Sequence, residues 1–308
     1  MAQFHLKVLK EFKDVNISAI SSTKRGLKKR LEIKKKYKIK NQYSSVKSML
    51  KKEKLDGVFI APSVDMVFNI TEQCLKKGIN SFIEKPPALS IDKLKKLINL
   101  QKKKKCTTMV GLQRRFYSNI LYAKKFAKKH GGISSIVIEA PENFSKILSK
   151  KKFKKNVINR WIFANGIHAL DLFSFFGGKI AKILALRKNF YYKQHPDSLH
   201  ALIKFKNKIF GNYISNWMSP GFWSIKIYGL NYKIYIEPLE KGIIINKKGK
   251  ISNLPISRVD KKFKPGLYNQ NRKFIDLIKN KKKNIYPGIS LEQSLDSMKL
   301  CSEILGKK

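Results

Sequence analysis

Acidic residues, arginine and cysteine are scarce in this sequence. Only 20 of the 308 residues are Asp or Glu, against 67 Lys or Arg, which leaves a formal net charge of +47. Only 8 of the basic residues are Arg, the side chain that bidentate recognition of phosphates and bases favours. The lysines are spread along the whole chain and accompany abundant Ile and Asn, residues with A/T-rich codons. We therefore attribute the charge to genome composition and expect no nucleic-acid partner; a nucleic-acid binder is the alternative that charge alone supports.

The cysteines Cys74, Cys106 and Cys301 are far apart and show neither metal-ligand nor disulfide spacing. The first 20 residues lack the apolar segment and cleavage site of a secretory signal peptide. No run approaches the roughly 18 apolar residues that span a bilayer. These absences predict a cytoplasmic protein with reduced thiols, no bound metal and no membrane partner.

The chain is long enough for two domains, and its first part alternates short apolar runs with helical patterns. The runs predict strands at Val15–Ile20, Gly57–Ala61, Asn80–Ile83 and Thr107–Leu112. The helical patterns cover Lys24–Lys36, Ser44–Lys54, Met66–Lys77 and Ile91–Lys103. This alternation predicts an α/β domain with a doubly wound parallel sheet, which binds ligands at the carboxyl ends of its strands.

The second part of the chain shows a different order of predicted helices and strands. Helices are predicted at Ile120–Lys129, Phe163–Phe176, Tyr268–Lys279 and Leu291–Leu305. Strands are predicted at Ile133–Glu139, Ala201–Phe205, Ile209–Asn216, Trp223–Tyr228, Lys233–Glu237 and Gly242–Asn246. Short strands with turn residues between them indicate a mainly antiparallel sheet. We therefore predict a first domain over residues 1–116 and a C-terminal α+β domain over residues 117–308.

The most informative string is SFIEKPPALS, Ser81–Ser90. Lys85 directly follows a buried strand, so its ammonium is expected at the carboxyl ends of the parallel strands, within reach of a bound ligand. Pro86 and Pro87 have no backbone N–H group to donate, and their rings stiffen the turn that positions the Lys85 side chain.

This string resembles the glutamate–lysine–proline segment of the Gfo/Idh/MocA family of NAD(P)-dependent oxidoreductases, named for glucose–fructose oxidoreductase and inositol dehydrogenase. Further similar segments, in the family's order, are DGVFIAP (Asp56–Pro62), VGLQRRF (Val110–Phe116), GIHALDL (Gly166–Leu172) and PGISLEQSLDSMKLCSEI (Pro287–Ile304). The resemblance implies a Rossmann-type dinucleotide-binding domain followed by a domain that binds the substrate. It also implies a homodimer or homotetramer in which the open face of the second sheet is covered by another subunit.

The resemblance assigns roles to particular residues. Catalysis falls to Lys85 and His168, because hydride removal from a carbinol carbon needs a base for the hydroxyl proton and a cation for the oxyanion. The implied cofactor-binding residues are Ser22, Thr23, Lys24, Arg25, Ala61, Pro62, Glu84 and Lys85. The implied substrate-binding residues are Lys85, Arg115, Asn165, His168 and Asp171. A core histidine is the alternative for His168, and an ordinary ion pair is the alternative for Arg115.

Asn165, His168 and Asp171 are spaced at i, i+3 and i+6, so we expect them close to one face of a helix. Ser22–Arg25 follows the predicted second strand, where NAD enzymes usually carry an acidic residue for the ribose diol. Hydroxyls and two cations suit a 2′-phosphate, so we favour NADP over NAD; an ordinary basic helix start is the alternative.

Three departures from the family pattern bear on activity. Ala164 stands where many members have an acidic residue, and Val67 stands where a histidine is usual. No G-x-G-x-x-G phosphate turn occurs, and Ala2–Phe12 matches the helix that follows that turn in the family. We therefore expect an N-terminally truncated product lacking the central first strand, through an internal start codon or gene decay.

The predicted activity is transfer of a hydride between nicotinamide and a carbinol carbon of a sugar, polyol or nucleotide sugar. Two alternatives keep the fold. One is a reaction of glycosidase or lyase type without net redox change, and the other is a catalytically impaired ligand-binding relic.

Overall fold

The computed structural model describes residues 1–149, 151–280 and 284–306, and the chain divides into two compact units. Unit 1 consists of Met1–Gln113 and Lys262–Leu295, and unit 2 consists of Arg114–Lys261 and Asp296–Lys308. The predicted boundary at residue 116 lies close to the first crossing between the units. The predicted second domain, 117–308, differs from unit 2 because the chain returns to unit 1 near its C-terminal end.

Unit 1 alternates strands with helices, and all its strand pairs are parallel. The strands are β1 (Ala19–Ser21), β2 (Asn41–Tyr43), β3 (Gly57–Ile60), β4 (Asn80–Ile83) and β5 (Thr108–Val110). The helices are α1 (Ala2–Leu9), α2 (Leu27–Tyr37), α3 (Val46–Lys52), α4 (Val67–Lys76), α5 (Ile91–Lys104) and α11 (Leu267–Lys279). The predicted α/β class with a parallel sheet is confirmed, and β4 has the bounds that the sequence predicts.

The parallel strands of unit 1 form two sheets. One has the order β1-β2 and the other β3-β4-β5, and no ladder joins β1 to β3 in the described ranges. Both sheets are parallel throughout, with β1 paired to β2 and β4 paired to β3 and β5.

The return of the chain to unit 1 has a packing cause that the sequence does not reveal. Phe274 of α11 makes edge contacts with Phe59 of β3 and Phe82 of β4, at centroid distances of 5.3 and 5.8 Å. Phe59 and Phe82 stack on each other at 4.9 Å. Aromatic pairs of this kind add to the stabilisation from burial alone. The apolar face of α11 is visible in the sequence, but its partner is not.

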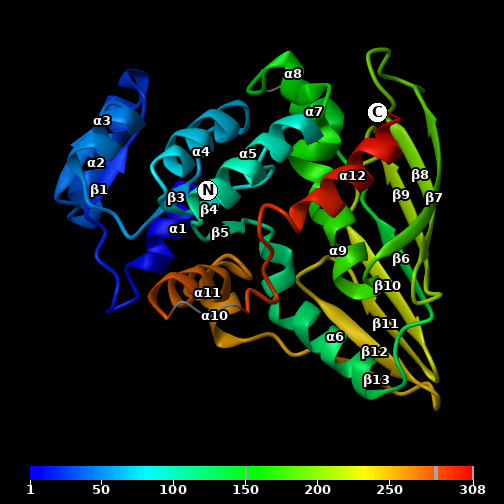
Figure 1. Ribbon diagram of the computed structural model, residues 1–308. Helices are drawn as coiled ribbons and strands as arrows, with labels where there is room; N and C mark the ends of the chain where they lie inside the picture. Colours follow the sequence, from blue (N-terminus) through cyan, green and yellow to red (C-terminus); the bar gives the residue numbers. More distant parts are fainter. Residues whose placement is uncertain (150, 281–283, 307–308) are drawn as a thin grey trace. The chain divides into compact units, whose positions relative to one another are not determined.

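Unit 2 is built on an eight-stranded sheet of order β13-β12-β11-β10-β6-β9-β8-β7, antiparallel except for the β6–β9 pair (Figure 1). Its strands are β6 (Ser135–Glu139), β7 (Ile180–Lys188), β8 (Ser198–Phe205), β9 (Phe210–Asn216), β10 (Ser224–Gly229), β11 (Tyr232–Ile236), β12 (Gly242–Asn246) and β13 (Ile251–Asn253). Its helices are α6 (Ser118–Lys129), α7 (Phe144–Ser149), α8 (Lys155–Ile158) and α9 (Ile167–Gly177). Two helices include the crossings between the units, α10 (Arg258–Lys262) and α12 (Ser294–Leu305). The mainly antiparallel second sheet is thus confirmed.

One face of this sheet packs against helix α9, which contacts β6 and β9. Strand β8 shows why only one face is covered: Leu199, Ala201 and Ile203 are buried, whereas His200 and Leu202 between them are exposed. This alternation is typical of a sheet with one packed face. No helix within the described ranges is long and apolar enough to cross a bilayer.

The cysteines are free and buried, which gives a prediction about reactivity. Burial raises the pKa of Cys74 to about 12 and raises the pKa of Cys106 and of Cys301. Because the thiolate is the reactive form, we expect Ellman's reagent at pH 8 to leave native protein unmodified and to titrate three thiols after denaturation. Rapid modification of folded protein would contradict this burial.

Candidate active site

In unit 1, two predicted segments leave the sheet side by side. Strands β3 and β4 are parallel, and Ile60 pairs with Ile83 at their carboxyl ends. Ala61–Pro62 and Glu84–Lys85 follow directly on these strands. Parallel register therefore brings the two segments to the same edge of the sheet, as the sequence predicts.

The turn that carries Lys85 is fixed on both sides. The Glu84 amide donates to Ile60 O at 2.9 Å, and the Gly111 amide donates to Ile83 O at 2.7 Å. A β-carbon on Gly111 would lie 3.3 Å from Glu84 Cα, so glycine permits the close approach of the two backbones. Glu84 and both following prolines are buried, whereas Lys85 is half-buried. The side chain of Lys85 is therefore presented from a well-packed turn.

Ser22–Arg25 follows β1, and Arg30 of α2 holds this segment. The Arg30 Nη1 group donates to Ser22 Oγ at 2.8 Å and to the carbonyl oxygens of Ser22 and Thr23, both at 3.2 Å. Arg30 is buried, while Lys24 and Arg25 are exposed. Hydrogen bonds from Arg30 thus hold the Ser22–Arg25 loop, and the loop exposes the cations of Lys24 and Arg25 to solvent. Sequence reasoning missed Arg30, although it is the only Arg in a helix rich in Lys.

In unit 2, Arg115 and Asp171 form a buried bidentate ion pair. Arg115 Nε donates to Asp171 Oδ2 at 2.6 Å, and Arg115 Nη2 donates to Asp171 Oδ1 at 2.7 Å. Ser297 Oγ of α12 donates to the same Oδ1 at 2.8 Å. The side chains of Arg115 and Asp171 are 10% and 2% exposed. The structure therefore brings two predicted substrate residues together, with the carboxylate of Asp171 hydrogen-bonded by protein donors.

Lys124 lies close to Arg115 of this ion pair. Lys124 of α6 donates to Phe175 O, and its ammonium lies 4.1 Å from the centroid of the Phe175 ring. Burial, together with the nearby Arg115 charge, lowers the pKa of Lys124 to about 8.

The side chain of Asn165 is hydrogen-bonded to Glu142, whereas that of Asp171 is hydrogen-bonded to Arg115 and Ser297. The Asn165 side-chain amide donates to Glu142 Oε1 at 2.5 Å. Asn165 lies in a π-helical turn, Ile162–Gly166, that precedes α9. A π turn is wider than an α turn and changes the angular relation between Asn165 and the residues of α9. His168 lies on α9, one turn before Asp171, and only 8% of it is exposed.

Asn165 also lines a pocket of about 240 Å³ in unit 2. The other lining residues are Arg114, Gly221, Phe222, Trp223, Pro238, Leu239 and Glu240. The Arg114 guanidinium lies 3.9 Å from the centroid of the Trp223 ring, and its Nη1 atom is buried with no hydrogen-bond partner among the described residues. Burial lowers the pKa of Arg114. Sequence reasoning missed Arg114, Trp223 and Glu142; the only signal was that Arg114 adjoins Arg115.

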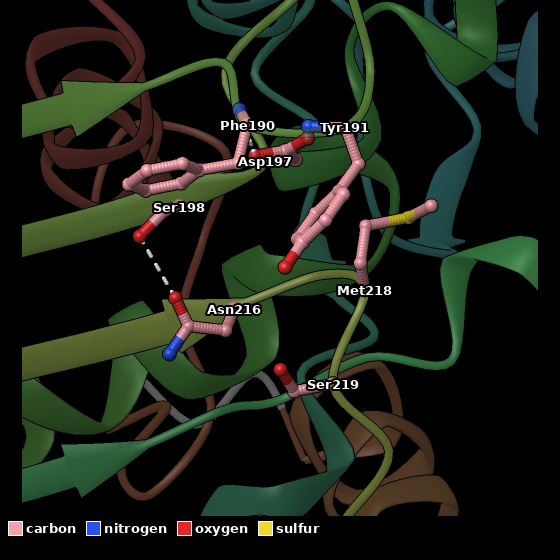
Figure 2. A pocket seen from close by; sticks show the side chains of 7 residues that line it. All are labelled: Phe190, Tyr191, Asp197, Ser198, Asn216, Met218 and Ser219. Carbon is pink, nitrogen blue, oxygen red and sulfur yellow. Dashed lines mark hydrogen bonds between the residues drawn. The ribbon is translucent and has the colours of Figure 1, made fainter.

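A second pocket in unit 2, of about 220 Å³, contains none of the predicted site residues (Figure 2). It is lined by Phe190, Tyr191, Asp197, Ser198, Asn216, Met218 and Ser219. Asp197 accepts the backbone amides of Phe190 at 2.9 Å and Tyr191 at 2.7 Å, and Ser198 Oγ donates to Asn216 at 2.8 Å. These bonds hold the loop between β7 and β8.

The residues of unit 1 fit two parts of a nicotinamide dinucleotide. The loop held by the buried Arg30 offers the Ser22 and Thr23 hydroxyls and two cations to a ribose phosphate. The turn after β4 offers the Lys85 ammonium, beside the backbone of Ala61–Pro62. Bound there, the dinucleotide would supply a hydride acceptor. A glycine-rich phosphate turn is not among the described residues.

The parallel strands and helices of unit 1 have a Rossmann-like arrangement. Residues 1–112 match the sequence model of the Gfo/Idh/MocA family, described as an oxidoreductase family with an NAD-binding Rossmann fold. The predicted family is thereby confirmed. No curated protein matches the chain significantly by sequence.

Several solved structures share the fold across the chain. An oxidoreductase from Agrobacterium radiobacter, in complex with NAD+, L-tartaric acid and magnesium, is 18% identical, with a TM-score of 0.81 and coverage of 98% of this chain and 91% of that one. UDP-N-acetylglucosamine 3-dehydrogenase from Acidithiobacillus ferrooxidans is 15% identical, with a TM-score of 0.79 and coverage of 99% and 93%. Apo scyllo-inositol dehydrogenase from Lactobacillus casei is 19% identical, with a TM-score of 0.77 and coverage of 99% and 91%. At these identities, the similarity establishes the fold.

Proposed function

We propose that the protein is an NAD(P)-dependent oxidoreductase that transfers a hydride between nicotinamide and a carbinol carbon of a sugar, polyol or nucleotide sugar. The observation that carries this proposal is the placement of Lys85, half-buried on a fixed turn at the carboxyl end of β4 in a unit of NAD-binding fold. The dehydrogenases among the structural neighbours act on compounds of this kind, as their names state.

The proposed chemistry assigns one task to each of two side chains. Lys85 provides the positive charge that stabilises the oxyanion developing on the carbinol oxygen. His168 accepts the hydroxyl proton during oxidation and returns it during reduction, a task suited to imidazole near neutral pH. Asn165 and the pocket it lines supply hydrogen bonds to substrate hydroxyls, and the Arg115–Asp171 pair holds α9 in place.

The choice of coenzyme gives a direct test. We propose NADP as the preferred coenzyme, because Lys24 and Arg25 follow β1 where a ribose 2′-phosphate is read. Loss of one charge-assisted hydrogen bond costs about 1.5–3 kcal/mol. Arg25→Ala should therefore weaken NADPH binding about tenfold or more and leave NADH binding unchanged, as measured by nicotinamide fluorescence titration.

Lys35→Ala is the matched control, since Lys35 is exposed near the other end of α2 and carries the same charge. If neither coenzyme binds the wild-type protein at millimolar concentration, the proposed function is wrong. If Arg25→Ala and Lys35→Ala weaken both coenzymes equally, the assignment of the 2′-phosphate site is wrong.

We also propose a homo-oligomer assembled through the open face of the unit 2 sheet. Leu184 and Leu202 are cross-strand neighbours on β7 and β8 and are 59% and 58% exposed. Leu186 of β7 and Phe210 of β9 are 67% and 58% exposed. Contiguous apolar residues on an uncovered sheet mark an interaction surface, and a self-complementary face suits a second copy.

Introducing a charge into this face should dissociate the assembly. Leu202→Glu is expected to give monomers at concentrations where the wild-type protein sediments as a dimer or tetramer, because burial of an unpaired carboxylate is costly. Analytical ultracentrifugation over a concentration series measures this. Leu230→Glu, at an exposed turn between β10 and β11, should leave the assembly intact. A wild-type monomer at all concentrations would refute the proposal.

A further inference from the structure

Three polar side chains from distant parts of the chain meet in the interior of unit 1. His5 lies on α1, Glu84 follows β4, and Asn271 lies on α11. The Nε2 atom of His5 lies 2.8 Å from Glu84 Oε1, and the Nδ1 atom lies 2.9 Å from Asn271 Oδ1. His5, Glu84 and Asn271 are 1%, 5% and 0% exposed. Both ring nitrogens of His5 are therefore hydrogen-bonded in a site that water does not reach.

Aromatic rings surround this cluster. The His5 ring lies 5.0 Å from Phe82 and 5.5 Å from Phe59, centroid to centroid. A hydrogen bond to a carboxylate is stronger in such surroundings than in water, and an unpartnered carboxylate there is strongly unfavourable. The Glu84 carboxylate is consequently held in place by the His5 bond.

Glu84 immediately precedes Lys85, so anchoring one constrains the other. The Glu84 backbone amide is fixed to Ile60, and Pro86 and Pro87 are buried on the far side of Lys85. The Glu84 carboxylate would lie only 3.2 Å from a β-carbon on Gly111, which leaves it little room for another orientation. The side chain of Glu84 thus acts as the anchor at the start of the turn.

We propose that His5 is a positioning residue for the Lys85 turn: it donates from Nε2 to the Glu84 carboxylate, while Asn271 orients the ring through Nδ1. This inference rests on the proposed function for its catalytic consequence but not for its structural content. His5 touches neither substrate nor coenzyme in this assignment and acts through Glu84 on the placement of Lys85.

The first test uses two substitutions of His5. His5→Leu removes the donor, whereas His5→Gln retains an N–H group at a similar reach. Because small displacements of a reacting group cost up to about a hundredfold in rate, we expect kcat to fall tenfold or more in His5→Leu, with KM changed less than twofold. His5→Gln should restore most of the activity.

Leu75→Ala provides the control for lost stability. Leu75 is fully buried in α4 of the same unit. Its truncation should lower the melting temperature as His5→Leu does, yet leave kcat unchanged. Equal losses of kcat in Leu75→Ala and His5→Leu would overturn the positioning role.

Two NMR measurements test the inference without any turnover. In protein labelled at histidine nitrogens, His5 should show a slowly exchanging, low-field Nε2 proton that disappears in His5→Leu. After reductive ¹³C-methylation, the Lys85 methyl signal, identified by its loss in Lys85→Arg, should shift in His5→Leu and return in His5→Gln. A rapidly exchanging His5 proton, or a Lys85 signal unchanged in His5→Leu, would overturn the proposal even if no substrate is found.

Discussion

Lys85→Met is expected to lower kcat by about 10²- to 10⁴-fold, the range that one positioned proton-transfer or charge-stabilising group contributes. Methionine keeps most of the unbranched apolar part of the side chain and removes the ammonium group. The thermal unfolding midpoint should stay near the wild-type value, because Glu84 and the two prolines, not Lys85, are the buried parts of the turn. Steady-state kinetics and circular dichroism measure the two quantities.

Lys95→Met is the matched control in a chain rich in lysine. Lys95 is exposed on α5, the helix that follows the Lys85 turn, and its replacement removes the same charge. We expect full activity from Lys95→Met. A Lys85→Met protein that retains more than a tenth of wild-type kcat would contradict the catalytic assignment.

Asp171→Ala is expected to destabilise unit 2 by about 3–5 kcal/mol, because it leaves the Arg115 guanidinium buried without its carboxylate partner. At about 2–4 °C for each kcal/mol in a domain of this size, the unfolding midpoint of unit 2 should fall by roughly 10 °C. Scanning calorimetry is the suitable measurement, since two units need not unfold in one transition.

A double substitution separates the ion pair from the rest of the core. Arg115→Leu with Asp171→Leu removes both charges and should recover most of the stability lost in Asp171→Ala. Ser297→Ala removes only one hydrogen bond to Asp171 and should cost about 1 kcal/mol. If the double variant is as unstable as the sum of its single variants, unpaired charge is not the cause.

The sequence predicts the strands of unit 1 best where they are short, apolar and buried. Gly57–Ile60 has three apolar residues after a Gly, and Asn80–Ile83 ends in Phe82 and Ile83 after an Asn, so their bounds are clear. The β7 strand, Ile180–Lys188, was missed because it is an edge strand whose Lys and outward Leu residues hide the alternation. The three-residue strands β2 and β13 are too short to carry a periodic signal.

Tertiary partners are the part of the fold that local patterns do not encode. The helix at Leu267–Lys279 was predicted almost to the residue; it lies in unit 1, whereas the predicted second domain includes it. Its apolar face was evident, yet nothing local indicates that Phe274 packs on Phe59 and Phe82. The same holds for His5, whose partners are 79 and 266 residues away in sequence.

The candidate site was predicted unevenly for physical reasons. A strand end followed by Glu84 and Lys85 is a local feature, so its place at the sheet edge followed from the sequence. The spacing of Asn165, His168 and Asp171 assumed a regular α-helix, and the π turn at Ile162–Gly166 alters that geometry. Glu142 lies in an irregular segment and Arg114 in a short 3-10 helix, Gln113–Phe116, and a lysine-rich background makes both hard to single out.

Hydride transfer between nicotinamide and a carbinol carbon is tested most directly by absorbance at 340 nm. Wild-type protein and Lys85→Met are each offered a panel of sugars, polyols and nucleotide sugars with NADP+ or NAD+. We expect a rise in absorbance with at least one compound for the wild-type protein, and its near loss in Lys85→Met. Product formation without net absorbance change, or no coenzyme-dependent conversion of any compound, would contradict it.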